Sequence, residues 1–248
     1  MWAGSVQAGD AAAAFAGAPC HQGGRVRLSG MRIGRITAWM CLALSAIPTA
    51  RAVDLQARLS AAAPALDRKV LTLALEARAC AARDHAVGRR LAVIDYSQPS
   101  TDVRMWVFDL VDGRLLHAEH VAHGRGSGDA LPTVFSDVEG SFQTSLGLFA
   151  MAETYIGQNG YSLRMDGLEP GFNGHARERL IVMHGADYVD PVRAQTQGRL
   201  GRSWGCPAVR SAVAREVIDA LKGGQLLFAY ADDAAWLAGS LLLHCGAR

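Results

Sequence analysis

Short apolar runs separated by glycine-containing turns fill the chain from Leu91 to Tyr230, and this alternation limits the fold most. Runs of strand length and composition lie at residues 91–97, 104–110, 114–124, 179–185 and 225–230. The Asp112–Gly113 pair between the second and third runs is a hairpin signal. A glycine-interrupted run at 140–155 is interpreted as a further strand. The pattern predicts a mainly β fold with a few helices, in a sandwich or barrel-like core.

Three other segments are expected to be helical, which makes the expected class α+β. Residues 64–86 repeat apolar side chains at helical spacing, and Pro64 suits a first helical position. Residues 211–221 are amphipathic and run into Gly223–Gly224, a typical helix C-terminus. Residues 231–245 are expected to form a closing helix that packs on the first one.

The first 52 residues have the composition of a leader. Residues 31–52 combine a positive start with Arg32 and Arg35, an apolar stretch and a small-x-small sequence ending at Ala52, which is typical of a secretory signal peptide. The apolar stretch is shorter than the about 20 residues of a membrane span, so no stable span is expected after cleavage. We expect residues 1–30 to be a mis-called start or a disordered leader. The mature protein, from Val53, is then periplasmic or secreted.

Charge and motif content exclude some classes of function. A net charge of +2 without a long basic run disfavours nucleic acid as a partner. No HExxH or CxxC pattern is present, so neither a metal nor another cofactor is predicted. His117, His120 and His123 would alternate between strand faces and so would not form one ligand set. The glycine-rich segment 124–129 does not join a strand to a helix, and is expected to be a mobile surface loop rather than a phosphate loop.

Three cysteines follow the leader, and an odd number leaves at least one unpaired in an oxidising compartment. If the closing helix packs on the first helix, Cys80 and Cys245 can form a disulfide. Cys206 lies in the turn GRSWGCPAVR, residues 201–210. Its thiol can be a buried structural group, half of a disulfide or a nucleophile, and the residues around it leave these readings open.

His184 is a candidate base for Cys206. It lies near the end of a predicted buried strand, and Cys206 follows in a turn just before a predicted helix. A histidine beside a thiol can take its proton and later return it to a leaving amine. Pro207 has no N–H, so the backbone donors for an oxyanion must come from Cys206, Gly205 or Trp204.

These residues resemble a known family. His184-Gly185 followed by Ser203-Trp204-Gly205-Cys206 resembles the HG…S-x-G-C signature of YkuD-type L,D-transpeptidase catalytic domains. The runs at 161–173 and 176–189 are similar to the murein L,D-transpeptidase catalytic domain-like subgroup. The resemblance implies a catalytic domain over residues 90–230 with a β-sandwich core. The flanking parts are then an N-terminal helical segment, 53–89, and a C-terminal helix or tail, 231–248.

The resemblance also implies roles at the matching positions. Cys206 is the nucleophile and His184 is the general base. The N–H groups of Gly205 and Cys206 stabilise the oxyanion, and the Gly185 backbone orients the imidazole. Asp187 is an alternative orienting group. The candidate substrate-binding residues are Ser203, Trp204, Arg202, Arg164, Arg179 and Tyr161, in which the guanidinium groups suit carboxylates.

The implied reaction is acyl transfer from peptidoglycan stem peptides through a thioester, without a cofactor. It gives a 3→3 cross-link, or L,D-carboxypeptidase activity if water is the acceptor. The chain departs from the common pattern at Trp204, Pro207 and Ala208, which bears on the substrate more than on the cysteine–histidine chemistry. These departures motivate an alternative: a non-catalytic cell-wall-binding domain in which Cys206 is structural.

Overall fold

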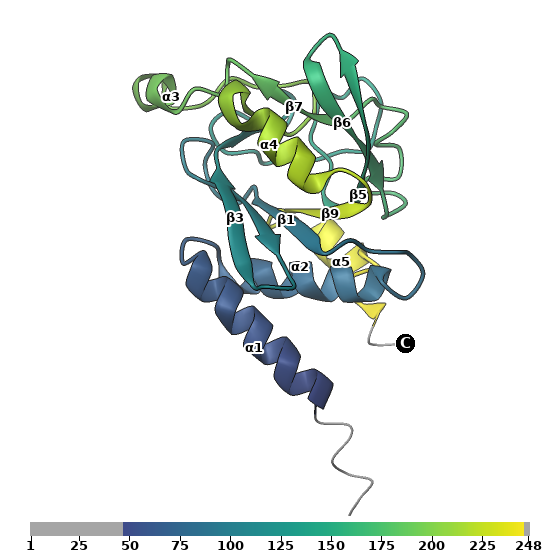
Figure 1. Ribbon diagram of the computed structural model, residues 1–248. Helices are drawn as coiled ribbons and strands as arrows, with labels where there is room; N and C mark the ends of the chain where they lie inside the picture. Colours follow the sequence, from purple (N-terminus) through teal and green to yellow (C-terminus); the bar gives the residue numbers. More distant parts are fainter. Residues whose placement is uncertain (1–46, 246–248) are drawn as a thin grey trace, which may run out of the picture. The chain divides into compact units, whose positions relative to one another are not determined.

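A computed structural model describes residues 47–245, with side chains from Val53 onward. In this range a mixed α+β fold is built on one large sheet (Figure 1). The strands are β1 (Arg90–Asp95), β2 (Met105–Asp109), β3 (Arg114–Glu119), β4 (Val121–Ala122), β5 (Gly147–Gly157), β6 (Gly160–Gly167), β7 (Val182–Ala186), β8 (Ala208–Arg210) and β9 (Gln225–Tyr230). The helices are α1 (Ile47–Ala62), α2 (Arg68–Ala81), α3 (Pro191–Gln197), α4 (Ser211–Leu221) and α5 (Ala234–Gly239).

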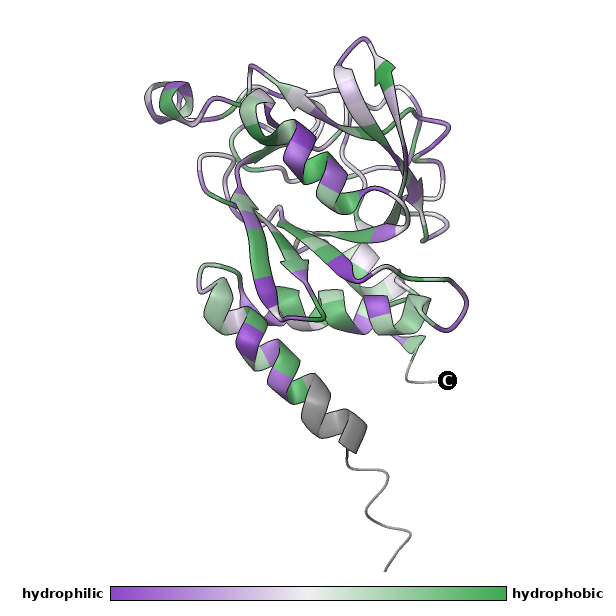
Figure 2. Cartoon of the chain, viewed as in Figure 1, coloured by the Kyte–Doolittle hydropathy of each residue, from purple (hydrophilic) through white to green (hydrophobic). Residues whose placement is uncertain are grey.

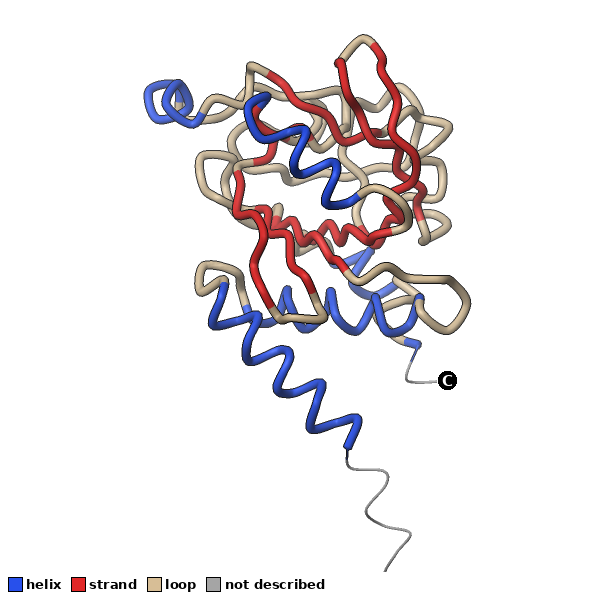
Figure 3. Tube along the Cα trace, viewed as in Figure 1, coloured by secondary structure: helices blue, strands red, loops and turns tan. Residues whose placement is uncertain are grey.

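The sheet curls, and its two edge strands, β3 and β4, follow each other directly in the sequence. Its strand order is β3-β2-β1-β9-β5-β6-β7-β8-β4, and only His120 separates β3 from β4 in the sequence. The pairs β1–β9 and β7–β8 are parallel, and the other neighbouring pairs are antiparallel. The predicted α+β class with a mainly β core is therefore confirmed, and the curled sheet can be followed along the strands in Figure 3.

Arg104 stabilises the corner at which the strand passes from β3 to β4. Its side chain is fully buried. The guanidinium donates two hydrogen bonds to the Val121 carbonyl, at 3.1 and 2.8 Å, and one to the Gln98 carbonyl, at 2.9 Å. It also lies over the Tyr96 ring, with its carbon 5.0 Å from the ring centroid. Burial lowers the pKa of Arg104 to about 10, so the group remains charged at neutral pH.

Helices cover both sides of the central strands. Helix α2 contacts β1, β5 and β9, while α4 lies on the other side and contacts β7, β6, β8 and β1 (Figure 1). The buried residues of α4 recur at Ala214, Val217, Ile218 and Leu221, so one stripe of the helix faces the sheet. Figure 2 shows the alternating polar and apolar bands of this helix. Strands β2 and β9 are buried along nearly their whole length, as expected for strands covered on both faces.

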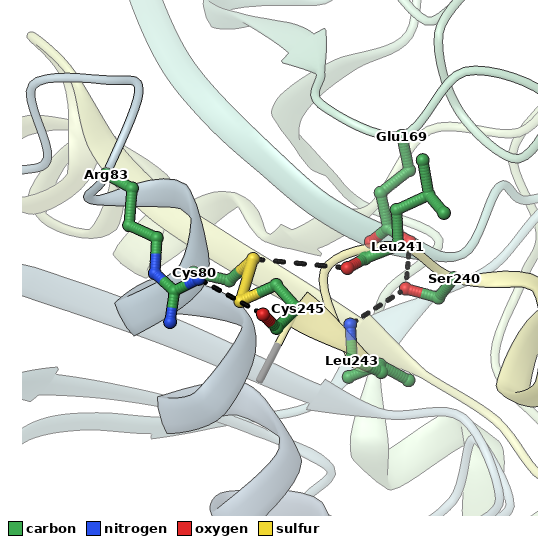
Figure 4. Close-up of a disulfide and its surroundings, with 7 residues drawn as sticks. All are labelled: Cys80, Arg83, Glu169, Ser240, Leu241, Leu243 and Cys245. Atoms are coloured by element: carbon green, nitrogen blue, oxygen red, sulfur yellow. Dashed lines mark hydrogen bonds between the residues drawn. A yellow bond between two sulfur atoms is a disulfide. The ribbon is translucent and has the colours of Figure 1, made fainter. Parts of the chain in front are cut away.

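Cys80 and Cys245 form a disulfide, which confirms the predicted pairing (Figure 4). Their Cα atoms lie 6.0 Å apart. The end of the chain is held at two further points. Arg83 Nη1 donates to the Cys245 carbonyl at 3.1 Å, and the buried Glu169 carboxylate accepts a hydrogen bond from Ser240 Oγ. The C-terminal segment is thereby fixed beside α2.

Reducing this disulfide is expected to lower the free energy of unfolding by about 2–4 kcal/mol. The bond links residues 165 positions apart, so its loss releases a long loop in the unfolded chain. Urea unfolding with and without reductant measures the difference. The Cys245→Ser variant should unfold like the reduced protein, and should lose its sensitivity to reductant. Equal unfolding midpoints for oxidised and reduced protein would contradict this expectation.

Several predicted elements differ in extent from the observed ones. The helix predicted at 64–86 corresponds to α2, which begins after Asp67. The Asp67 carboxylate caps α2 by accepting from the Lys69 N–H, so Pro64 lies outside the helix. The run at 140–155 is a strand only from Gly147 onward. The closing helix is only α5, six residues long. The prediction contained neither the β6 strand nor the short α3 and β8, because these segments lack a continuous apolar run.

The described part of the N-terminus is helical. Helix α1 runs through Ala52 and Val53, the predicted cleavage point. The rest of the predicted signal peptide, and residues 1–30, lie outside the described residues. Among the described helices, none has the length and apolar character needed to cross a bilayer.

Candidate active site

The parallel strands β7 and β8 bring His184 and Cys206 to the same face of the sheet. The register pairs His184 with Ala208, and Cys206 precedes Ala208 by two residues. Side chains two positions apart in extended chain share a face. Gly185 faces the opposite side, because a Cβ at this position would lie 2.7 Å from the Ala214 Cβ on α4. The face that carries His184 and Cys206, here called the nucleophile face, is therefore the one not covered by α4.

The Cys206 thiol lies against the backbone of β7. Its Sγ is 3.5 Å from the Val182 amide nitrogen and 3.7 Å from the Leu180 carbonyl oxygen. Cys206 is the free cysteine among the described residues, and it is partly exposed. Burial raises the pKa of the thiol, and the Val182 N–H and the Arg179 charge oppose that rise. The sulfur is thus mainly protonated near neutral pH, so it would need a base to act as a nucleophile.

The His184 imidazole has a defined tautomer. Its Nδ1 lies 2.9 Å from the Gly185 carbonyl oxygen. A carbonyl only accepts, so Nδ1 carries the proton and Nε2 presents its lone pair. Burial lowers the pKa of His184, and the ring is neutral at pH 7. Asp187, the alternative orienting group, instead accepts from Ser211 Oγ at 2.6 Å.

The thiol and the imidazole make no direct hydrogen bond in the part of the chain that the structure describes. Catalytic hydrogen bonds are often long before substrate binds, and tighten in the complex. The register pairs His184 with Ala208, and Cys206 lies two residues before Ala208, just ahead of the neighbouring strand β8. Their partnership in proton transfer therefore stays a prediction.

Ser203 stabilises the turn at residues 201–210, here called the nucleophile turn, through its hydroxyl. Its hydroxyl donates to the Cys206 carbonyl at 2.6 Å and accepts from the Gly205 N–H at 3.1 Å. Of the two N–H groups that the family resemblance assigns to the oxyanion, that of Gly205 is therefore engaged inside the turn. Among the described residues the Cys206 N–H has no acceptor outside its own side chain, which leaves it as the better placed donor.

The Gly205→Ala variant is expected to lower catalytic activity about 100-fold by displacing the adjacent nucleophile by about 1 Å. Gly205 has a φ of +126°, and an added Cβ would lie 2.9 Å from both the Gln143 carbonyl oxygen and Ile181 Cδ1. The matched control is Gly198→Ala, where φ is +73° but no atom lies within 4 Å of the added Cβ. Release of the terminal residue from a tetrapeptide measures both. Equal effects of the two variants would show that crowding at Gly205 is unimportant.

Two of the arginines predicted to bind substrate instead donate hydrogen bonds to backbone carbonyls of the protein's own loops. Arg179 is buried and donates to the carbonyls of Ser136 and Gln143, at 2.7 and 2.8 Å. Arg202 donates to the Gly128 carbonyl at 2.7 Å. Both guanidinium groups fix the segments around the nucleophile turn, so their observed contacts are structural.

The other two predicted residues on the strands lie on opposite faces. Arg164 is paired in register with Val182, which places it on the nucleophile face, and it forms an ion pair with Glu153 at 3.2 Å. Tyr161 donates its hydroxyl hydrogen to Asp219 of α4 at 2.7 Å. Since α4 covers the other face, Tyr161 lies away from Cys206.

Arg125 and Phe142 lie beside the turn and were missed by sequence reasoning. The Arg125 guanidinium carbon is 4.2 Å from the Phe142 ring centroid and 5.5 Å from that of Trp204. Trp204, a predicted substrate-binding residue, is 68% exposed. The glycine-rich segment 124–129, expected to be a mobile loop, is hydrogen-bonded to the nucleophile turn through the Arg125 N–H and the Ser203 carbonyl. Its glycines were the signal that could have indicated close backbone packing.

A pocket near the candidate site is lined in part by Arg179. Its volume is about 580 Å³, and its lining includes Phe135, Asp137, Arg179 and Trp236 but neither Cys206 nor His184. Cys206 and His184 therefore lie outside the lining of this pocket. Within the described residues, no group of three or more His, Cys, Asp or Glu side chains is arranged to hold a metal ion.

The sequence matches the family model described as L,D-transpeptidase catalytic domain over residues 62–230, more than half of the chain. A search of curated proteins gives no match. Among solved structures, an L,D-transpeptidase from Mycobacterium smegmatis is similar at 15% identity and a TM-score of 0.36, with 58% of this chain and 59% of that chain covered. L,D-transpeptidase 3 from Mycobacterium tuberculosis is similar at 13% identity and a TM-score of 0.37, with 58% and 61% covered.

A further similar structure is the L,D-transpeptidase (Yku) from Stackebrandtia nassauensis, at 14% identity and a TM-score of 0.35, with 65% of this chain and 68% of that chain covered. The chain spans about three fifths of the length of the Mycobacterium smegmatis structure. At such low identities and TM-scores, family membership depends on the match to the family model.

Proposed function

The chain belongs to the L,D-transpeptidase catalytic domain family, and from this membership we propose that it is an exported cysteine L,D-transpeptidase acting on peptidoglycan stem peptides. The observation that carries the proposal is the strand pair β7–β8, which sets the free Cys206 and the neutral, oriented His184 on one face. The Cys80–Cys245 disulfide supports export, because such bonds persist in oxidising compartments.

In the first half-reaction, Nε2 of His184 takes the proton from Cys206 Sγ as the sulfur attacks a carbonyl carbon. That carbon belongs to the diamino acid at stem position three, in its bond to a D-amino acid at position four. The oxyanion that forms accepts a hydrogen bond from the Cys206 N–H. The C–N bond then breaks, the imidazolium returns its proton to the leaving amine, and the acyl group remains on sulfur as a thioester.

In the second half-reaction an amine of another stem peptide replaces the thiolate. His184 takes a proton from the attacking amine, a new C–N bond forms, and the C–S bond breaks to regenerate the thiol. The product is a 3→3 cross-link. If water attacks instead, the thioester is hydrolysed to a tripeptide, and the enzyme acts as an L,D-carboxypeptidase.

Incubation of the purified protein with tetrapeptide muropeptides tests this proposal. Mass spectrometry should find release of the terminal D-amino acid, together with cross-linked dimers or tripeptides. The product distribution assigns the acceptor. No release above the level of a Cys206→Ala variant would contradict the proposal.

One observation favours the alternative of a cell-wall-binding domain with a structural cysteine. The Cys206 thiol already contacts two backbone groups of the segment leading into β7, as a structural thiol would. Thiol labelling separates the two functions. A thiol that reacts with a labelling reagent below pH 8, and stops reacting when His184 is replaced, indicates the enzyme; an inert thiol together with binding to isolated cell wall indicates the alternative.

A further inference from the structure

An exposed cation stacked on two aromatic rings adjoins the nucleophile turn. It consists of Arg125, Phe142 and Trp204, here called the Arg125 platform. The rings of Phe142 and Trp204 have centroids 5.5 Å apart, and the Arg125 guanidinium lies over both. Trp204 keeps 68% of its surface exposed although it is two residues from Cys206. The platform is thus a solvent-facing feature that includes a residue two positions before the Cys206 nucleophile.

Backbone contacts keep the three residues of the platform close together. The Arg125 N–H donates to the Ser203 carbonyl at 2.8 Å. Gly124 permits close packing of the loops, because a Cβ there would lie 2.3 Å from the Phe142 carbonyl oxygen and 2.8 Å from the Gly205 Cα. Phe142 itself has a φ of +56°, a left-handed conformation that is unfavourable for a bulky residue. Strain of this kind is concentrated at functional sites.

The charge of Arg125 is uncompensated in the described part of the chain. No carboxylate there forms an ion pair with it, whereas Arg164, Arg177 and Arg202 each pair with an Asp or Glu. A guanidinium stacked on an aromatic ring keeps the N–H groups at its edge free. Those groups form a fork that matches the two oxygens of a carboxylate. The platform is therefore suited to an anionic ligand with a small apolar part.

We propose that the Arg125 platform binds the terminal carboxylate of the stem peptide, on the D-amino acid that leaves during acylation. This inference rests on the proposed function. In such a peptide a single carbon separates the carboxylate from the nitrogen of the bond that breaks. An anion-binding group that adjoins the nucleophile turn is placed to bind it while Sγ attacks. The aromatic rings would cover the small side chain of the same residue.

The test compares a tetrapeptide with a free C-terminal carboxylate and the same peptide with a C-terminal amide. Binding is measured by calorimetry on the Cys206→Ala protein, in which no turnover occurs. We expect the free carboxylate to be preferred, and Arg125→Gln to weaken its binding about 10- to 100-fold while changing binding of the amide little. Arg193→Gln, on the exposed surface of α3, is the control and should leave both affinities unchanged.

A preference for the carboxylate that survives Arg125→Gln would overturn the inference. Equal affinity for the two peptides in the Cys206→Ala protein would also overturn it, and would point to a sugar ring stacked on Trp204 as the ligand instead. Turnover is measured separately on the protein with Cys206 intact. Absence of release from either peptide contradicts the proposed function, while a binding preference that depends on Arg125 would still support the carboxylate site.

Discussion

Replacement of Cys206 by alanine is expected to abolish release of the terminal D-amino acid, with a rate loss of about 10⁴-fold or more. The sulfur is the atom that forms the thioester, so without it neither half-reaction can proceed. The variant should fold normally, because the Sγ contacts with the β7 segment are at 3.5 and 3.7 Å and contribute little to stability. Release from tetrapeptide muropeptides, measured by mass spectrometry, checks the expected loss.

Two further variants test whether the loss of activity is specific to the sulfur of Cys206. Cys206→Ser keeps a hydroxyl at the same position, but an alcohol is a much weaker nucleophile, so it should be almost as inactive as the alanine variant. Cys245→Ser removes a disulfide-bonded sulfur outside the candidate site and should retain activity at temperatures where it is folded. Substantial release by Cys206→Ala would mean that another group performs the chemistry.

Replacement of His184 by glutamine is expected to lower kcat/KM about 10³- to 10⁴-fold. Glutamine can occupy the space of the imidazole, but it cannot take a proton from Sγ. Because burial raises the pKa of Cys206, little thiolate is available to compensate near neutral pH. Steady-state kinetics on a tetrapeptide measures the loss, and retention of the native unfolding midpoint shows that the fold is intact.

The pH profile gives an independent test of the role of His184. Burial lowers the pKa of this imidazole below its ordinary value of 6.5, so the ring is an unprotonated base above that lowered pKa. Activity should therefore fall as the pH drops through a value below 6.5. In His184→Gln this acid limb should disappear, and the residual rate should rise with pH as the thiol ionises. An acid limb unchanged in His184→Gln would assign it to another group.

The sequence predicted the elements that carry the chemistry because their local patterns are strong. The apolar run ending near His184 is β7, the amphipathic segment from Ser211 is α4, and QLLFAY is β9. The glycine–cysteine turn between β7 and α4 follows from the same patterns. The disulfide followed from the odd number of cysteines together with the expected packing of the chain ends.

Contacts between segments that lie far apart in the sequence could not be predicted from local residue patterns. The position of β9 between β1 and β5 depends on pairing with Leu91, far away in the sequence. The roles of the arginines depend on the same kind of contact. Arg179 looks like any charged residue in the sequence, but in the fold it meets four groups of the segment 136–145. Arg125 became a candidate only when the fold placed it over Phe142 and Trp204.

Covalent trapping of the acyl-enzyme tests most directly whether Cys206 is an acylated nucleophile. A carbapenem presents a strained ring amide, and attack by Sγ opens the ring so that the whole compound remains attached through a thioester. We expect the protein to gain the full mass of the carbapenem, on the peptide that contains Cys206, and Cys206→Ala to gain none. A protein that stays unmodified, or an adduct of the same mass that persists in Cys206→Ala, would contradict the assignment.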